Sequence, residues 1–383
     1  MGYRRGELQW SADTGPIRFK ANQIVEVRVE FALPARVALA MLLLGSLSIP
    51  DIAPSPVKPT EPIAGILDAF KTRRIVGIPD AHRNTATHAF VLSLIRHPRF
   101  PTVVDDVVVE CGTSRHQDVA DRFVRGEDVP YETLRHIWLD TTQAQPGCDT
   151  PQPEETLRAV RAVNASSPGD RQIRVLLGDP PIRWEDVNTK ADHRKWIAMR
   201  ETYPAGVVQR EVLAKRRRAL LLYGVGHLWR KNPHANFESA GLAASLVSLL
   251  EETHGASVFT VGLTLELETT RPQVASWPAP SVVALRGTDL GAEPVSFDGP
   301  RVSVQTGRIA PVPLDQWRSI RMQEQYDALL YIGPRASWSN AMVSPALCAD
   351  PAYLEMRTGR MALAEWKSDR LEDYCGTVRP PQK

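Results

Sequence analysis

The chain has 383 residues, a formal net charge of +2, 43% hydrophobic residues and 23% charged residues. This composition is ordinary for a globular protein and supplies enough apolar residues for a sizeable core. The near-neutral charge and the lack of a nucleic-acid-binding motif exclude nucleic acid as the main partner. A small molecule or a peptide is left as the expected substrate class.

The first 62 residues are predicted to form an extension before the folded domain. Residues 1–33 are polar and show no clear periodicity. Arg36 then precedes an apolar run at 37–48, which has the pattern of a secretory signal and is too short for a comfortable membrane span. Residues 51–62 carry four prolines and indicate an extended linker. We therefore expect an exported protein without a stable membrane span; the alternative is a buried core helix in a cytosolic protein.

From residue 63 to the C-terminus, apolar runs alternate with segments of helical spacing. This alternation predicts a single α/β domain with a mostly parallel central sheet and helices on both faces. Prolines break up residues 264–325, which we interpret as insertions and edge elements rather than a second core. Strands are expected at 74–77, 106–110, 173–177, 219–224, 257–263 and 328–332. Helices are expected at 85–96, 114–124, 131–139, 154–163, 206–218 and 239–252.

The sequence contains four cysteines. None forms a C-x-x-C pair, so a structural zinc site built from thiolates is not expected. In an exported protein Cys348 could pair with Cys375, or Cys148 could bridge to a C-terminal cysteine, and the sequence does not decide between these pairings. Cys111 lies in an apolar run and is expected to be a buried free thiol.

The first candidate site follows the strand expected at 74–77, because parallel α/β sheets bind ligands at the carboxyl ends of their strands. Asp80 and His82 lie in the loop after this strand. A carboxylate two residues before a histidine can hold the imidazole in one tautomer or share a metal ion with it. His88 falls in the helix that follows. The alternative is a capped loop in which His82 is merely exposed.

Two further strands end in carboxylates. Glu110 closes a V-V-V run, where a carboxylate is costly to bury unless it is paired or coordinates something. The helix after it carries His116, Gln117 and Asp121, which face either the same rim or solvent. Asp179 stands between a strand and two prolines. It either lines the site or precedes a turn fixed by the prolines.

The last candidate loop follows the strand expected at 219–224. Gly224 and Gly226 allow a sharp turn that displays His227 at the sheet edge. Arg200 and Glu201 precede the helix that leads into this strand, and they form either part of the site or a surface ion pair.

These residues suit two chemistries. His82 and His227 could bind a divalent metal that activates water. Alternatively His82 acts as a general base oriented by Asp80, while His227 or an arginine such as Arg200 stabilises an oxyanion. The sequence has no G-x-S-x-G, no Walker loop and no G-x-G-x-x-G after a strand, which argues against a serine hydrolase, a P-loop enzyme and a Rossmann dehydrogenase.

At these positions the chain resembles the superfamily of erythromycin esterases, ChaN-like haem-binding lipoproteins and TraB/TIKI proteins. The resemblance spans roughly residues 72–265. It departs from the family pattern at Asp80, where a glutamate is usual, and at Pro79, which stiffens the loop. The matching segments are Gly77…Asp80-Ala81-His82 followed by Asn84 and His88, then Val109-Glu110, Arg200-Glu201 and Gly224-Val225-Gly226-His227.

The resemblance implies an α/β fold with its site at the carboxyl edge of the sheet. Members of this superfamily differ in function: they hydrolyse esters, cleave peptides with a metal or bind haem. We therefore expect a hydrolase whose site contains Asp80, His82, Glu110, Arg200 and His227. The alternative is an exported protein that binds haem or another cofactor without catalysis, with His82 or His88 as axial ligand. A third possibility, suggested by Asp80, is a scaffold whose site no longer reacts.

Overall fold

The structure is a computed structural model. No helix of the part that it describes is long and apolar enough to cross a membrane. The predicted apolar segment at 37–48 lies outside the described residues, which are 55–167, 169–231, 244–263, 271–295, 302–305, 308–311, 319–364 and 371–376.

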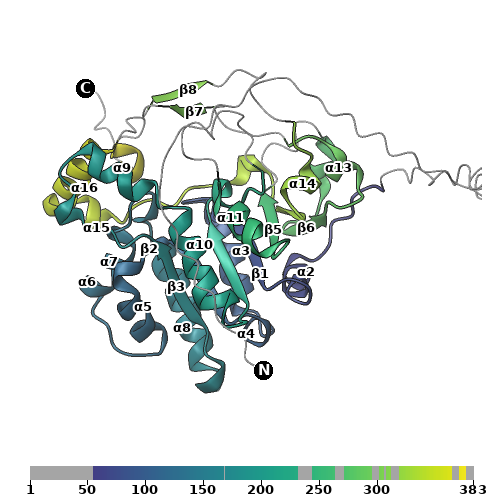
Figure 1. Cartoon of the computed structure of the whole chain (residues 1–383), viewed down its shortest axis with the longest axis horizontal. Helices are drawn as coiled ribbons and strands as arrows, with labels where there is room; N and C mark the ends of the chain where they lie inside the picture. Colours follow the sequence, from purple (N-terminus) through teal and green to yellow (C-terminus); the bar gives the residue numbers. More distant parts are fainter. Residues whose placement is uncertain are drawn as a thin grey trace, which may run out of the picture. The chain divides into compact units, whose positions relative to one another are not determined.

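A seven-stranded sheet forms the centre of the domain, with strand order β3-β2-β4-β1-β5-β9-β6 (Figure 1). Every neighbouring pair is parallel except β6 and β9, which are antiparallel. The expected α/β class is thus confirmed. The strands are β1 (Ile75–Pro79), β2 (Asp106–Thr113), β3 (Arg174–Asp179), β4 (Ala219–Tyr223), β5 (Val258–Leu263), β6 (Ser281–Ala284) and β9 (Ala328–Tyr331); β7 (Val302–Gln305) and β8 (Arg308–Pro311) form a separate antiparallel pair.

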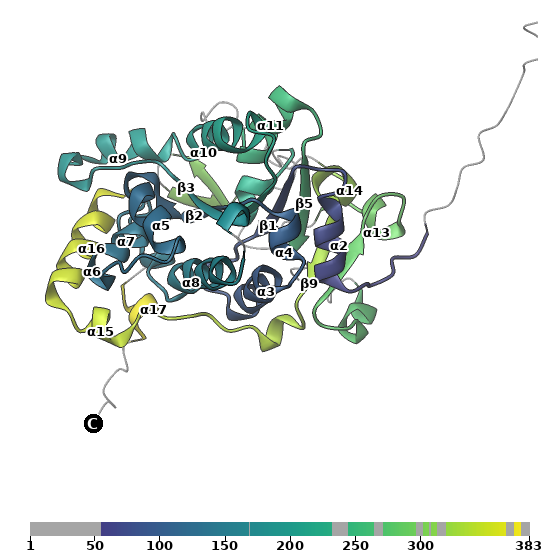
Figure 2. The ribbon, with the colours of Figure 1, turned by 90° about the horizontal axis from the view of Figure 1, so that it is seen from below.

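Successive residues of the central strands pack into two different apolar layers. Ile78 and Leu222 belong to the cluster that contains α3 and α8, whereas Leu221 and Tyr223 belong to the cluster that contains α10 and α11. Figure 2 shows these helix pairs on opposite sides of the sheet. Both faces are therefore largely apolar, as in other parallel sheets.

The helices largely follow the expected segments. The segment expected at 131–139 is two short helices, and the helix expected at 206–218 begins earlier and ends in a π-helical turn at Gln209–Leu213. Of the helix expected at 239–252, residues 239–243 lie outside the described part. The helices are α2 (Pro62–Ala69), α3 (Thr85–Arg96), α4 (Phe100–Val103), α5 (Gln117–Val124), α6 (Tyr131–Leu134), α7 (His136–Leu139), α8 (Gln152–Ala165), α9 (Lys190–Ile197), α10 (Thr202–Val208), α11 (Leu246–His254), α13 (Asp289–Ala292), α14 (Met322–Gln325), α15 (Pro345–Cys348), α16 (Pro351–Leu363) and α17 (Glu372–Cys375).

Residues 55–60, within the predicted linker, already pair with the edge of the sheet. The backbone N–H of Ser55 donates to Gly287 at 3.1 Å, and that of Thr60 donates to Val282 of β6 at 2.9 Å. The division into an extension at 1–62 and a domain at 63–383 stays a prediction.

The C-terminal segment packs against the loop after β1. The backbone N–H of Thr85 donates to Ser339 at 2.9 Å, and that of Ala341 donates to Arg83 at 2.6 Å. Arg83 has a positive φ of 70° and places its guanidinium 4.5 Å above the ring of Tyr374. A non-glycine residue in this conformation is held there by its surroundings, so the C-terminal segment helps to fix the loop that carries His82.

The structure contains two disulfides, and one of them differs from the cysteine pairing expected from the sequence. Cys111 bonds to Cys148, so Cys111 is not a free thiol and Cys148 does not bridge to the C-terminal region. The pairing of Cys348 with Cys375 is confirmed. Sequence reasoning missed the first bridge because Cys148 lies in a loop that returns to the end of β2 only in the folded chain.

A fully buried ion pair anchors the same loop. Arg357 of α16 and Asp149 are 0% and 2% exposed, and the Arg357 Nε–H donates to Asp149 Oδ2 at 2.6 Å. Arg357 also donates to the carbonyls of Leu139 at 2.8 Å and Gln143 at 3.1 Å. Such a pair is costly to break, because either partner alone leaves an uncompensated buried charge.

We expect Arg357→Met to destabilise the protein by about 3–5 kcal/mol, because it leaves the buried Asp149 carboxylate without its cationic partner. Denaturant unfolding checks this expectation. Arg158→Met is the control, because Arg158 pairs with Glu154 on the surface and should contribute less than about 1 kcal/mol. Equal losses in both variants would contradict the role given to Arg357.

Candidate active site

The loop between β1 and α3 presents Asp80 and His82. The Asp80 N–H donates to the carbonyl of Tyr223 at 2.7 Å, which fixes the start of the loop to the end of β4. Asn84 caps α3, accepting from the Thr87 N–H at 2.8 Å. Between these two anchors, His82 Nδ1 lies 3.4 Å from Asp80 Oδ2.

Glu110 of β2 is the buried carboxylate around which the site is built. It is 3% exposed, so its charge needs partners within the protein. Its Oε2 accepts from the Gly224 N–H at 2.6 Å, and its Oε1 accepts from the Gln143 side-chain amide at 3.1 Å. The guanidinium of Arg200 donates to the same Oε1.

Two imidazoles from distant loops also meet Glu110. His82 Nε2 and His227 Nε2 each lie 3.3 Å from Glu110 Oε1. His227 Nδ1 lies 2.7 Å from Glu201 Oε1, and the other oxygen of Glu201 accepts from the Leu246 N–H at 2.7 Å. The structure therefore brings His82, Glu110 and His227 together, with Glu201 behind His227.

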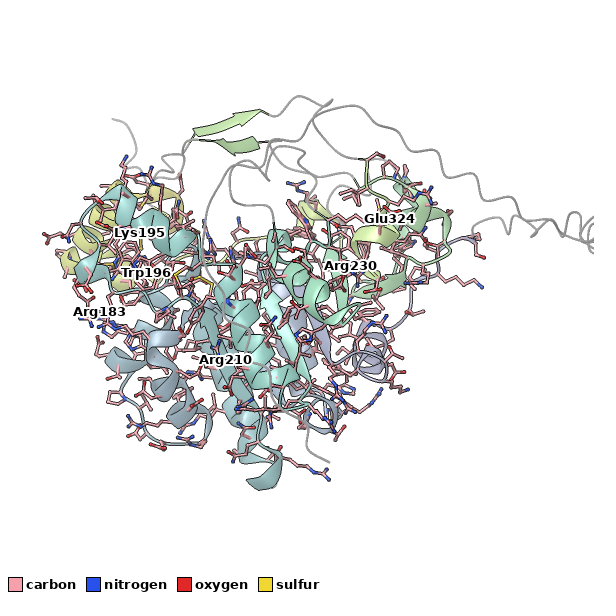
Figure 3. The ribbon with its side chains drawn as sticks, in the orientation of Figure 1. Arg183, Lys195, Trp196, Arg210, Arg230 and Glu324 are labelled. Carbon is pink, nitrogen blue, oxygen red and sulfur yellow. A yellow bond between two sulfur atoms is a disulfide. The ribbon has the colours of Figure 1, made fainter. Side chains whose placement is uncertain are left out.

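The segment after His227 is anchored by Arg230 (Figure 3). Its Nε–H donates to Glu251 of α11 at 3.2 Å, and its terminal nitrogen donates to the carbonyl of Val258 in β5 at 2.8 Å. This anchoring and the edge-on contact with Tyr223, whose ring centroid lies 5.6 Å away, limit the positions open to His227.

Asp179 lies behind Arg200 rather than facing the imidazoles. Its oxygens accept from the Thr142 N–H at 2.7 Å and the Thr142 hydroxyl at 2.5 Å, and one lies 4.0 Å from Arg200 Nε. Burial, opposed by Arg200, raises the pKa of Asp179 to about 7. Asp179 thus supports Arg200 and the loop that carries Thr142.

The charges at the centre reinforce one another. Burial alone would raise the pKa of Glu110, but His227, His82 and Arg200 hold it well below its usual range. Burial alone would lower the pKa of each histidine, but Glu110, with Glu201 at His227 and Asp80 at His82, raises that of His227 to about 9 and that of His82 well above 6.5. At neutral pH the site holds an ionised Glu110 among three cations.

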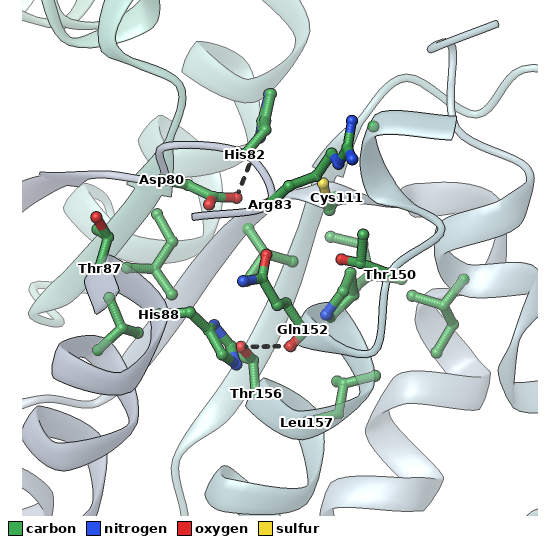
Figure 4. Close-up of a pocket in the computed structure, with 17 residues that line it drawn as sticks. Asp80, His82, Arg83, Thr87, His88, Cys111, Thr150, Gln152, Thr156 and Leu157 are labelled. Atoms are coloured by element: carbon green, nitrogen blue, oxygen red, sulfur yellow. Dashed lines mark hydrogen bonds and ion pairs between the residues drawn. The ribbon is translucent and has the colours of Figure 1, made fainter. Parts of the chain in front are cut away.

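A pocket opens beside His82, between the sheet and helices α3 and α8 (Figure 4). Asp80, His82 and Cys111 line it near the site, and Leu157 lies at the opposite end of this view. The imidazole-bearing residue His82 is thus part of the pocket wall.

The other predicted residues lie elsewhere. His88 lines the pocket and contacts Glu155 at 2.9 Å. His116 lies apart from Glu110, in a group with His136 and Asp140 whose donor atoms are within 4.8 Å of one another.

Gln117 and Gln143 show why side-chain amides were hard to assign from sequence. Gln117 binds the backbone of β3, donating to Val175 and accepting from Leu177, so it supports the sheet. Sequence reasoning missed Gln143 altogether, because a glutamine in a loop far from any strand end carries no signal of its contact with Glu110.

The donor atoms do not suit a metal shared by His82 and His227. Both imidazoles face Glu110 Oε1, which the Arg200 guanidinium also contacts, so a further cation there would be repelled. A second group, Asp80, His82 and Cys111, has donor atoms within 4.8 Å of one another, but Cys111 is in a disulfide and offers no thiolate. The arrangement instead suits proton transfer and stabilisation of negative charge.

Comparisons with known proteins support the fold. No protein-family model and no curated protein sequence matches the chain. A solved succinoglycan biosynthesis protein matches with a TM-score of 0.52 and 10% identity over 75% of this chain and 96% of that one. A Bacillus cereus protein matches with a TM-score of 0.45 and 13% identity over 76% and 97%. Erythromycin esterase EreC in its open conformation matches with a TM-score of 0.48 and 12% identity over 73% and 94%.

The first of these matches shows a shared α/β fold. It agrees with the α/β fold that the resemblance drawn from the sequence motifs implies.

The raised pKa of His227 predicts a pH dependence of stability. Because this pKa rises from 6.5 to about 9 on folding, its contribution to the free energy of unfolding is complete below about pH 6.5 and is lost as pH rises through 9. The difference in stability between the wild type and His227→Gln should therefore shrink as pH rises from about 6 to about 10. Denaturant titrations of both proteins measure it, and a constant or growing difference would contradict the assignment.

Proposed function

We propose that the chain is a metal-independent hydrolase that cleaves an ester. The observation that carries the proposal is the convergence of His82 and His227 on one oxygen of buried Glu110, beside a pocket that reaches His82. A general base, a carboxylate that orients it and fixed positive charges are the parts that acyl hydrolysis requires.

His82 acts as the general base. Its side chain is 31% exposed against 14% for His227, and it lines the pocket, whereas His227 does not. The contacts of its Nε2 with Glu110 and Gln143, at 3.3 and 3.5 Å, are longer than strong hydrogen bonds. Once deprotonated, Nε2 is therefore available to accept a proton from water, while Asp80 holds Nδ1.

His227 and Arg200 supply positive charge. Glu201 and Glu110 hold His227 in its charged form, and Arg200 is charged at any physiological pH. Fixed cations beside a carbonyl stabilise the negative charge that develops on its oxygen in the tetrahedral intermediate. Glu110 positions these cations without touching the substrate.

The reaction follows from these roles. The water oxygen forms a bond to the carbonyl carbon while the water proton passes to His82 Nε2. The carbonyl oxygen carries the negative charge until the ester C–O bond breaks. The proton on His82 then passes to the leaving alkoxide, which releases an alcohol and a carboxylic acid and returns His82 to its neutral form.

Removing either imidazole should abolish turnover. We expect His82→Ala to lower kcat/KM for a p-nitrophenyl ester by about 100-fold or more, and His227→Ala to lower kcat strongly through loss of charge stabilisation. Circular dichroism confirms folding, and His254→Ala at the exposed end of α11 serves as control. Retained turnover in a folded His82→Ala protein would reject the assignment.

The acidic centre sets the pH at which the base works. Because the Glu110 charge raises the pKa of His82, Glu110→Gln should lower that pKa and move the rising limb of the kcat/KM profile to lower pH. The shift is read from profiles of both proteins on the same ester. A limb that stays in place or moves to higher pH would show that the titrating base is not coupled to Glu110.

Haem binding is the competing function, because His82 and His88 line the same pocket. Titration with haem and absorption spectroscopy decide between the two. A Soret band that is lost in His88→Ala, together with no ester turnover, would replace the hydrolase proposal.

We also propose that the protein acts outside the cytoplasm. The disulfides Cys111–Cys148 and Cys348–Cys375 are compatible with export, since such bonds persist in oxidising compartments. Fractionation of cells that express the full chain tests this location.

A further inference from the structure

The pocket beside His82 has an apolar interior. Its walls include Val91 from α3, Leu157 from α8 and Leu177 and Leu222 from the sheet. All four side chains belong to the main hydrophobic core of the domain. The interior is thus a gap in that core, and it continues to Asp80 and His82 at the carboxyl edge of the sheet.

Several polar side chains around the pocket are already bound to protein partners. The Thr87 hydroxyl donates to Asn84 at 3.0 Å, the Gln152 amide donates to the Asn84 carbonyl at 3.1 Å, and the Thr156 hydroxyl donates to the Gln152 carbonyl at 3.0 Å. His88 contacts Glu155. A ligand that enters the pocket therefore meets mainly apolar surface and polar groups that have protein partners, and gains most by burying an apolar group.

The interior is narrow. It has room for only a few water-sized groups. That space favours a short unbranched chain over a bulky group. Each buried methylene contributes about 0.8 kcal/mol, so binding should improve with chain length until the chain reaches the floor and then fall sharply.

We propose that this pocket is an acyl-chain subsite, which takes the short linear acyl group of the substrate while the carbonyl lies beside His82. The turnover part of this inference rests on the proposed hydrolase function. The binding part does not, because the carboxylate of a short fatty acid would meet the charged form of His82 with its chain in the same pocket.

The first experiment compares p-nitrophenyl acetate, butyrate and octanoate as substrates of the full chain. We expect kcat/KM for butyrate to exceed that for acetate by about tenfold or more, since each added methylene that fits an apolar pocket adds discrimination. The kcat/KM for octanoate should be lower than that for butyrate, because the octanoyl chain is too long for the pocket. A flat series, or a steady rise to octanoate, would overturn the subsite.

The second experiment fills the pocket. Val91→Phe should lower the ratio of kcat/KM for butyrate to that for acetate by about tenfold, because the ring occupies the space of the chain. Val160→Phe is the matched control: Val160 is equally buried, lies on α8 and does not line the pocket, so the ratio should be unchanged. An unchanged ratio in Val91→Phe would contradict the proposal. If that variant does not fold, Val91→Ala should raise the octanoate-to-butyrate ratio instead.

A binding measurement separates the subsite from the chemistry. Butyrate should raise the Tm of the wild type more than acetate at equal concentration, and the difference should disappear in Val91→Phe and persist in Val160→Phe. Butyrate binding without ester turnover would reject the hydrolase and keep the subsite. Turnover without any preference for butyrate, in kinetics or in Tm, would keep the hydrolase and reject the subsite.

Discussion

The buried charge of Glu110 is the constraint on which the rest of the site depends. A carboxylate inside a buried strand loses its hydration and must regain an equivalent environment from the protein. Its partners come from four separate segments: the loop after β1, the loop that carries Gln143, the region before α10 that carries Arg200, and the turn after β4. The need to satisfy one carboxylate therefore forces loops distant in sequence to meet at one point.

The same arrangement has a chemical cost. Glu110 stabilises the charged forms of His82 and His227, and the charged form of His82 is the one that cannot accept a proton. Stability and basicity therefore oppose each other at this site. The two histidines divide these tasks according to their surroundings, because His227 is enclosed between Glu110 and Glu201, whereas His82 is more exposed and lies beside the pocket.

Short-range pattern was enough to predict six of the seven strands of the sheet, while β6 falls in residues 264–325, which were interpreted as insertions and edge elements. The V-V-V run before Glu110 and the glycines before His227 predicted strand ends there, and the rule for parallel sheets then brought both residues to one edge, although β2 continues to Thr113. What the sequence did not reveal depends on long-range contacts that leave no local pattern. Gln143 meets Glu110 through a loop held by Arg357, and Cys111 meets Cys148 through the same loop.

Asp80 shows how the central carboxylate compensates for a departure from the family pattern. An aspartate is one methylene shorter than the glutamate that the resemblance leads us to expect, and its contact with His82 is correspondingly long, at 3.4 Å. The imidazole is nevertheless held from its other side, where Nε2 faces Glu110. The backbone of Asp80 is tied to Tyr223, so the loop itself does not depend on the Asp80 side chain. In its charged form His82 is therefore held by Glu110 as well as by Asp80, and once Nε2 has given up its proton, Asp80 and the loop backbone hold the base.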